Sequence, residues 1–257
     1  GKQVSAAAGE LTLTAQRFVN QAGASALVTT GDHVWQVWSS NANPFDATTG
    51  DVSGSLAYAY KQYRANYGAT SPLGSGHGML YSLAPTLSVS LTGVVSRSYD
   101  GGVLAAVSAS HFQLAGAVDS DQIQLSTPST ARYTTAGTGP GVKDVGGQKT
   151  VEASGVAVLS ATRGSAPVYG YTLSSTTASG QIGDIVAKEV VLSATKGYDG
   201  TLVLDAGAVA IKTGIGSETL SYSQASSSDA HIGTGVSPSA YRRIVRSLRP
   251  DSLANPR

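Results

Sequence analysis

The stretch Leu87 to Gly101, LSVSLTGVVSRSYDG, decides the fold class because it joins a strand pattern to a turn that recurs near the C-terminus. Its first half alternates apolar residues with serine and threonine, the apolar ones being Leu87, Val89 and Leu91. This period of two places one face of a strand against a core and leaves the other face in water. The stretch therefore predicts a half-buried β-strand followed by a tight turn.

The turn Tyr99-Asp100-Gly101 recurs as Tyr198-Asp199-Gly200 after a second apolar run. Asp-Gly is a typical turn pair, because glycine accepts positive φ and aspartate bonds the turn backbone. The tyrosine can cover the turn while its hydroxyl stays in water. We therefore expect tandem β modules, in which Tyr99 and Tyr198 have similar surroundings, and a structural role is favoured over an enzymatic one.

Composition narrows the class of protein. Charged residues make up 13% of the 257 residues and the formal net charge is +1, which argues against a nucleic-acid-binding protein. Cysteine is absent, so disulfides, thiolate nucleophiles and cysteine-rich metal sites are excluded. Alanine, valine and leucine are mixed with many serines, threonines and 31 glycines, a composition that suits an all-β fold. No apolar run is long enough to span a bilayer.

The chain divides into five predicted segments. Near the N-terminus, Leu11 and Leu13 alternate with threonines, and Asn20 and Gly23 supply corners typical of a β-solenoid (β-helix). The modules that contain the Tyr-Asp-Gly turns are expected to be a β-sandwich or a grasp-like sheet. The predicted segments are a short stub of solenoid rungs at 1–40, an aromatic-rich junction at 41–85, a first module at 86–187, a second and incomplete module at 188–236, and a basic amphipathic helix with a tail at 237–257.

The junction contains LAYAYKQYRANYG, in which tyrosines fall at helical spacing. The stretch can be a short helix or an extended loop that caps the solenoid. An aromatic cluster of this kind can stack on sugars, although packing is the favoured interpretation. The residues proposed for contact with a glycan or a partner are Trp35, Trp38, Tyr60, Tyr63 and Tyr67.

The C-terminal segment starts with Ser237-Pro238, a pair typical of a helix start. The predicted helix has an apolar face and an arginine face, and Pro250 ends it. We favour docking on a module over contact with an anionic surface. The apolar face comprises Tyr241, Ile244, Val245 and Leu248, and the other face comprises Arg242, Arg243, Arg246 and Arg249.

Sequence motifs for catalysis are not found. There is no G-x-S-x-G or H-E-x-x-H motif, and the four histidines lack the spacing of metal ligands. Asp119-x-Asp121 could touch a calcium ion, but a turn before the strand Ile123 to Leu125 is the better interpretation. We therefore expect no catalytic residue, no cofactor and no metal site.

Ordered motifs give the chain a resemblance to a known family. RFVNQAGASAL is followed by WQVWS, YKQYRANYG is followed by GSGHGMLYSLAPTLSVSLTG, and the two Y-D-G units come next. Over about residues 9–234 this succession resembles filamentous-haemagglutinin-type exoproteins of two-partner secretion systems, in the region after their long β-helix. The resemblance implies a secreted, rod-like adhesin on the surface of a Gram-negative bacterium, with YDG repeat domains and no catalytic residues.

The expected function is that of a secreted structural or adhesive protein, a subunit of an extracellular fibre or a biofilm-matrix filament. The incomplete second module exposes strand edges, which predicts a head-to-tail homopolymer built by strand addition between subunits. The alternative is a carbohydrate-binding adhesin module that uses the aromatic residues on a polysaccharide or a cell-surface glycan. An enzyme on a β-helix is less favoured, because the first forty residues carry few charges.

Overall fold

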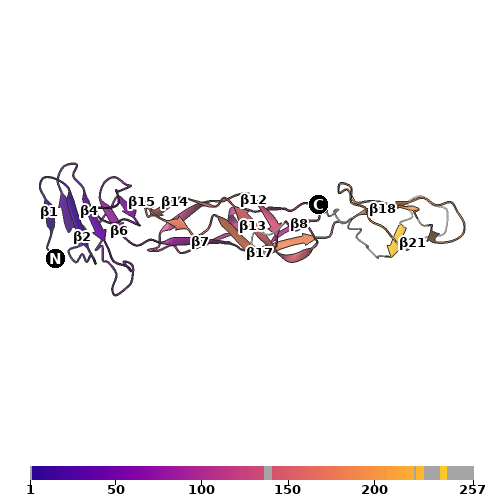
Figure 1. Cartoon of the computed structure of the whole chain (residues 1–257), viewed down its shortest axis with the longest axis horizontal. Helices are drawn as coiled ribbons and strands as arrows, with labels where there is room; N and C mark the ends of the chain where they lie inside the picture. The colour runs from indigo at the N-terminus through magenta and orange to yellow at the C-terminus, as the bar shows by residue number, and fades with distance from the viewer. Residues whose placement is uncertain (1, 136–140, 206, 223, 229–237, 242–257) are drawn as a thin grey trace, which may run out of the picture. The chain divides into compact units, whose positions relative to one another are not determined.

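The computed structural model describes residues 2–135, 141–205, 207–222, 224–228 and 238–241, the last four by their backbone only. Apart from the short 3-10 helices η1 (Gly23–Ser25) and η2 (Ala109–His111), regular structure in these residues is β-strand, which confirms the predicted all-β class (Figure 1). No described helix is long and apolar enough to cross a membrane. The strands fall into two compact units, and the second unit takes residues 98–102 and 143–145 together with the chain from residue 185 onward.

Parallel pairing builds the N-terminal part of the first unit. β1 (Val4–Ala6) and β3 (Leu27–Thr29) form one parallel pair. Five further strands lie side by side, each parallel to its neighbour, in the order β2 (Leu11–Ala15), β4 (Trp35–Ser39), β6 (Gly78–Tyr81), β5 (Tyr60–Gln62) and β15 (Ala166–Tyr169). Stacked parallel passes of the chain agree with the predicted solenoid and carry it well past residue 40.

β6 lies between β4 and β5, although β5 comes first in the chain. Every residue of β5 and β6 is buried, as expected for parallel strands that are covered on both faces. The helix considered for LAYAYKQYRANYG is therefore wrong at β5. A spacing of three and four residues between tyrosines fits a helix. The same spacing arises here because the two faces of the parallel sheet pack against different cores, with Tyr60 in one and Tyr63 in the other.

The first module continues the same unit. β14 (Ala157–Arg163) and β11 (Gln122–Ser126) extend the parallel sheet by antiparallel pairing beyond β15, which gives seven strands in all. The boundaries predicted at residues 40 and 85 consequently do not separate compact units. Two more sheets complete the module: β10 (Phe112–Ala115), β7 (Thr86–Leu91) and β16 (Thr172–Leu173), and then β8 (Val95–Ser98), β17 (Thr177–Val186), β13 (Gly146–Ser154), β12 (Thr130–Thr134) and β9 (Leu104–Ala106).

The second unit repeats part of this pairing scheme. Its strands are β18 (Val191–Ala194) paired with β20 (Val209–Lys212), and β19 (Val203–Leu204), β21 (Gln224–Ser227) and β22 (Pro238–Tyr241) in a second sheet. In order along the chain, β18–β20 correspond to β7–β10, and β19–β21–β22 correspond to β9–β12–β13. A small core of Leu204, Val209 and Ala225 holds the two sheets. In its described residues, no strand takes the places of β16 and β17.

The predicted C-terminal helix does not begin at Ser237-Pro238. Residues Pro238–Tyr241 form β22, which pairs antiparallel with β21. Proline is tolerated as the first residue of a strand as well as of a helix, so the sequence pair was ambiguous. The remaining residues of the predicted helix, from Arg242 to Arg249, lie outside the described residues.

Candidate functional site

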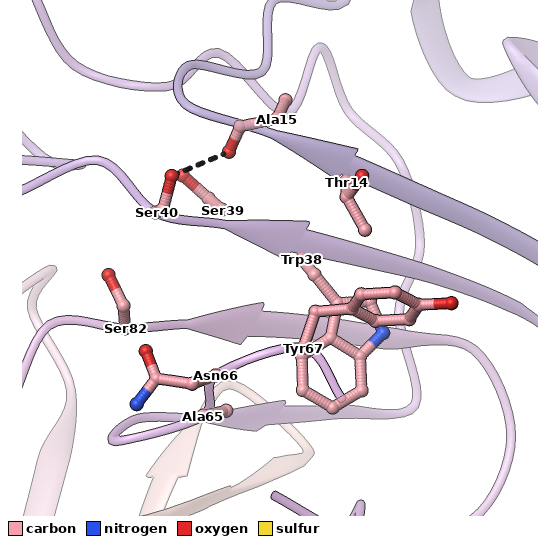
Figure 2. A pocket seen from close by; sticks show the side chains of 9 residues that line it. All are labelled: Thr14, Ala15, Trp38, Ser39, Ser40, Ala65, Asn66, Tyr67 and Ser82. Carbon is pink, nitrogen blue, oxygen red and sulfur yellow. Dashed lines mark hydrogen bonds between the residues drawn. The ribbon is translucent and has the colours of Figure 1, made fainter. Parts of the chain in front are cut away.

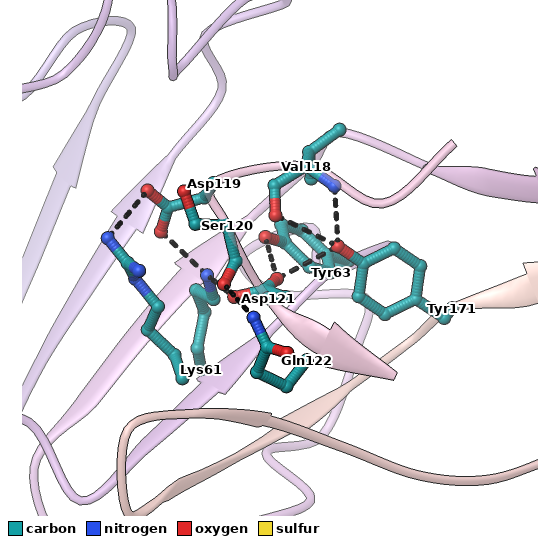
Figure 3. A network of polar contacts seen from close by, with 9 residues as sticks. Lys61, Tyr63, Val118, Asp119, Ser120, Asp121, Gln122 and Tyr171 are labelled. Carbon is teal, nitrogen blue, oxygen red and sulfur yellow. Dashed lines mark hydrogen bonds and ion pairs between the residues drawn. The ribbon is translucent and has the colours of Figure 1, made fainter. Parts of the chain in front are cut away.

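A buried polar network in the first unit is the best candidate for a functional site (Figure 3). Its centre is Lys61, in the middle of β5, whose side chain is 1% exposed. Lysine is almost never fully buried unless it is paired. We call the group the Lys61 cluster, and it consists of Lys61, Tyr63, Asp119, Asp121, Arg163 and Tyr171.

Two local features bring the cluster together. Lys61 lies in β5 and Tyr63 directly follows this strand, and both side chains reach the same carboxylate, that of Asp121. Opposite them, the turn before β11 holds Asp119 and Ser120 in the left-handed region, with φ of 51° and 54°. The Asp121 N–H closes this turn on the Val118 carbonyl at 3.0 Å. The turn thereby presents both carboxylates to the lysine.

The contacts within the cluster are short. Lys61 Nζ donates to Asp119 Oδ2 at 2.7 Å and to Asp121 Oδ1 at 2.5 Å. The other oxygen of Asp121, Oδ2, accepts hydrogen bonds from the Tyr63 hydroxyl at 2.7 Å and the Tyr171 hydroxyl at 2.8 Å. Both oxygens of the buried Asp121 carboxylate are therefore occupied, one by the ammonium group and one by two phenols.

The surroundings of the cluster balance its charge and exclude water. Arg163 lies 3.6 Å from the second oxygen of Asp119, so two cations face two carboxylates. The rings of Phe45 and Tyr63 each lie 5.3 Å from Lys61 Nζ, within cation–π distance. The Asp121 side chain is fully buried, whereas the Asp119 side chain is 27% exposed. Lys61 and Asp121 are closed to water, whereas Asp119 and Arg163 are partly exposed.

Both phenols act as hydrogen-bond donors. Burial raises the pKa of the Tyr63 hydroxyl far above its usual value, and the neighbouring Asp121 carboxylate raises it further. Burial also raises the pKa of Tyr171, and Asp121 contributes in the same direction. Because both hydroxyls keep their protons, they present two donors to Asp121 Oδ2.

The cluster replaces the calcium site considered for Asp119-x-Asp121, because the ammonium group of Lys61 occupies the place between the carboxylates. Among the described residues, no group of three or more His, Asp or Glu side chains is placed to hold a metal ion. Sequence reasoning singled out the two aspartates but missed Lys61. The available signal was a single lysine within the aromatic stretch Tyr58 to Tyr67.

A shallow pocket of about 290 Å³ lies where β2, β4 and β6 end (Figure 2). Trp38 and Tyr67 form its aromatic part, with ring centroids 5.5 Å apart and an edge-to-face angle of 72°. Hydroxyl and amide groups supply the polar part. The residues that line the pocket are Thr14, Ala15, Trp38, Ser39, Ser40, Ala65, Asn66, Tyr67 and Ser82.

The predicted aromatic platform is not present as an exposed surface. Trp35, Trp38, Tyr60 and Tyr63 are all buried, and only Tyr67, 63% exposed, is open to solvent. The two tryptophans point to opposite faces of β4, Trp35 into one core and Trp38 into the other. Parallel strands covered on both faces bury aromatic residues that the composition alone could place at the surface.

The two Tyr-Asp-Gly turns share their backbone chemistry. Gly101 and Gly200 have φ of 78° and 74°. Asp100 Oδ1 accepts the Gly102 N–H at 2.7 Å, and Asp199 Oδ1 accepts the N–H of Thr201 at 2.9 Å. Both copies thus combine a glycine at positive φ with an aspartate that accepts a backbone N–H two residues further on.

The tyrosines of these turns have different surroundings, so the expectation of similar environments is wrong. Tyr99 is buried and its hydroxyl donates to Glu218 Oε1 at 2.6 Å, whereas Tyr198 is 70% exposed. Glu218 also lies 3.7 Å from Lys143 Nζ. Residues after β20 thus cover the first turn within the second unit, and no described segment covers the second turn in the same way.

The contacts of Glu218 with a tyrosine and a lysine resemble those of Asp121 in the Lys61 cluster. Glu218 follows β20 and Asp121 follows β10, the corresponding strand of the first module. Each acidic residue accepts a tyrosine hydroxyl and faces a lysine. The Lys143 and Glu218 side chains are 49% and 38% exposed, so this second pair is open to water where the first is closed.

Comparison of this chain with protein-family models, with curated proteins and with solved structures finds no match.

Proposed function

We propose that this chain is a secreted structural protein of a bacterial surface, a subunit of an adhesive fibre or a biofilm-matrix filament, and not an enzyme. The observation that carries the proposal is the pairing scheme repeated around the two Tyr-Asp-Gly turns, next to a stack of parallel rungs. Repeated β units that each pack on a neighbour extend a surface without needing an active site. The same succession carries the resemblance to filamentous-haemagglutinin-type exoproteins.

Strand edges support assembly into a head-to-tail polymer. β7 pairs with both β10 and β16, whereas β18 pairs only with β20 among the described residues. β2 likewise forms the edge of the seven-stranded sheet. Edge strands offer unpaired backbone N–H and C=O groups to another chain. In this proposal the β2 edge of one copy pairs with the β18 edge of the next.

A lysine placed on the β18 edge tests strand addition. Val191 is an exposed residue of this edge, and edge lysines oppose pairing with another chain. We expect Val191→Lys to keep the chain monomeric at concentrations at which the unaltered chain forms larger species in light scattering. Leu159→Lys is the matched control, because Leu159 is similarly exposed but lies on β14, which has a partner strand on each side. Equal assembly of the two variants would argue against the β18 edge.

Carbohydrate binding is the second candidate function, and the pocket beside Trp38 favours it. The pocket combines aromatic side chains, which can stack on a sugar ring, with hydroxyl groups, which can hydrogen-bond to sugar hydroxyls. We therefore propose the Trp38–Tyr67 pocket as the place where a glycan would bind.

Substitution of two exposed tyrosines, Tyr67 in the pocket and Tyr198 outside it, can distinguish glycan binding from a purely structural role. Tyr67→Ala should abolish binding on a glycan array if the pocket is the site, whereas Tyr198→Ala should leave binding unchanged. If the chain binds no glycan, or binds equally well after Tyr67→Ala, the pocket is not a glycan site and only the fibre proposal remains.

A further inference from the structure

We propose that Lys61 and Asp121 condense after folding into an intramolecular amide bond between Nζ and Cγ. The basis is the Lys61 cluster, in which the ammonium group of Lys61 and the carboxylate of Asp121 are held 2.5 Å apart and are themselves closed to water. Holding two reacting groups in a fixed geometry removes most of the entropic cost of their reaction. The proposal does not depend on the fibre function.

The protons of the reaction have paths in the structure. Lys61 passes one proton directly to Asp121 Oδ1 along their contact, and the neutral amine then attacks Cγ. Asp119, 2.7 Å from Nζ, takes a second proton from the nitrogen and returns it to Oδ1. Oδ1 leaves as water with these two protons, and the third stays on the amide nitrogen. Asp119 ends as it began, so no cofactor or oxidant is required.

The two phenols stabilise the intermediate of this reaction. Attack on Cγ moves negative charge onto Asp121 Oδ2, the oxygen that already accepts hydrogen bonds from Tyr63 and Tyr171. Donors fixed at the oxygen where charge develops are the usual device for acyl transfer. The product amide oxygen keeps both hydrogen bonds.

Burial favours the product over the starting ion pair. A charged lysine and a charged aspartate lose hydration in this site, whereas an amide carries no charge. The Phe45 and Tyr63 rings beside Nζ exclude the water that would hydrolyse the bond. The partly exposed Asp119 side leaves a route for the released water.

The mass of the full chain tests the proposal directly. We expect the purified, denatured chain to be lighter than its sequence by one water molecule. Trypsin should then fail to cleave after Lys61 and should release residues 18–64 joined to residues 98–132. A chain of full sequence mass that is cleaved after Lys61 would overturn the proposal.

Variants test the assigned roles. Asp121→Asn should lose ammonia in place of water, and Lys61→Arg should keep its full mass. Asp119→Asn removes the proton acceptor and should leave a folded chain without the cross-link, whereas a fully cross-linked Asp119→Asn chain would overturn the role of Asp119. Lys143, which faces Glu218 at 3.7 Å in an open site, is the internal control and should be cleaved normally.

Discussion

At the scale of single residues, Lys61 determines how the turn before β11 docks on the parallel sheet. Removing a lysine and two carboxylates from water is costly, and their mutual attraction offsets the cost only when every polar atom has a partner. The cluster meets this condition through two phenols, an arginine and short contacts to both aspartates. Such a cluster leaves one arrangement of the turn strongly preferred over others.

Replacing Lys61 tests how much the cluster contributes to stability. Lys61→Met should lower the free energy of unfolding of the first unit by about 3–5 kcal/mol or more, because the buried Asp121 charge loses its counter-ion and the proposed cross-link cannot form. Denaturant unfolding followed by the fluorescence of Trp35 and Trp38, both in this unit, measures the change. The exposed Lys2→Met serves as control and should change stability by less than about 0.5 kcal/mol. A similarly small loss for Lys61→Met would contradict the assignment.

The second Tyr-Asp-Gly turn has a predictable pH response. The hydrogen bond from Lys196 and the Thr201 N–H lower the pKa of Asp199 from 3.8 to about 2. A lowered pKa in the folded state means that the turn is stabilised above the unfolded pKa and loses this stabilisation as the pH falls through about 2. Carboxyl carbon NMR should show this titration, and Lys196→Ala should move the pKa back towards 3.8. Titration of Asp199 near its ordinary value in the unaltered chain would refute the contact.

At the scale of elements, the sequence predicted what is local and missed what is distant. Alternation at Leu87, Val89 and Leu91 identified β7, and the Asp-Gly pairs identified both turns. The position of β6 between β4 and β5 could not be predicted, because local alternation of apolar and polar residues indicates a strand but not which strands pair with it. For the same reason the partner of Lys61 was not identified: Asp121 is 60 residues away in the sequence.

The glycines of the segment LGSGHG have a packing role that can be tested. The Tyr60 ring lies against Gly74 and Gly78, and a methyl group at either position would overlap the ring. Gly78→Ala should therefore cost about 1–3 kcal/mol of stability. Gly147→Ala, where the nearest atom to the added methyl is 3.6 Å away, should change stability by less than about 0.5 kcal/mol in the same thermal unfolding experiment. Equal effects would show that the ring can move aside.

At the scale of the whole molecule, two features support the proposed role as a secreted structural protein. The repeated pairing scheme offers edges for other copies, and the Lys61 cluster ties the parallel sheet to the first module. An amide cross-link across 60 residues would add about 4 kcal/mol by the loop-closure argument used for disulfides. A chain without cysteine would thereby gain a covalent tie that no reductant breaks.

Electron microscopy of the purified chain at high concentration can show whether this protein assembles through its strand edges, as proposed. Pairing of the β2 edge with the β18 edge should give linear filaments in which copies follow one another head to tail, and these filaments should be lost in Val191→Lys but not in Leu159→Lys. Isolated single particles at every concentration would contradict it.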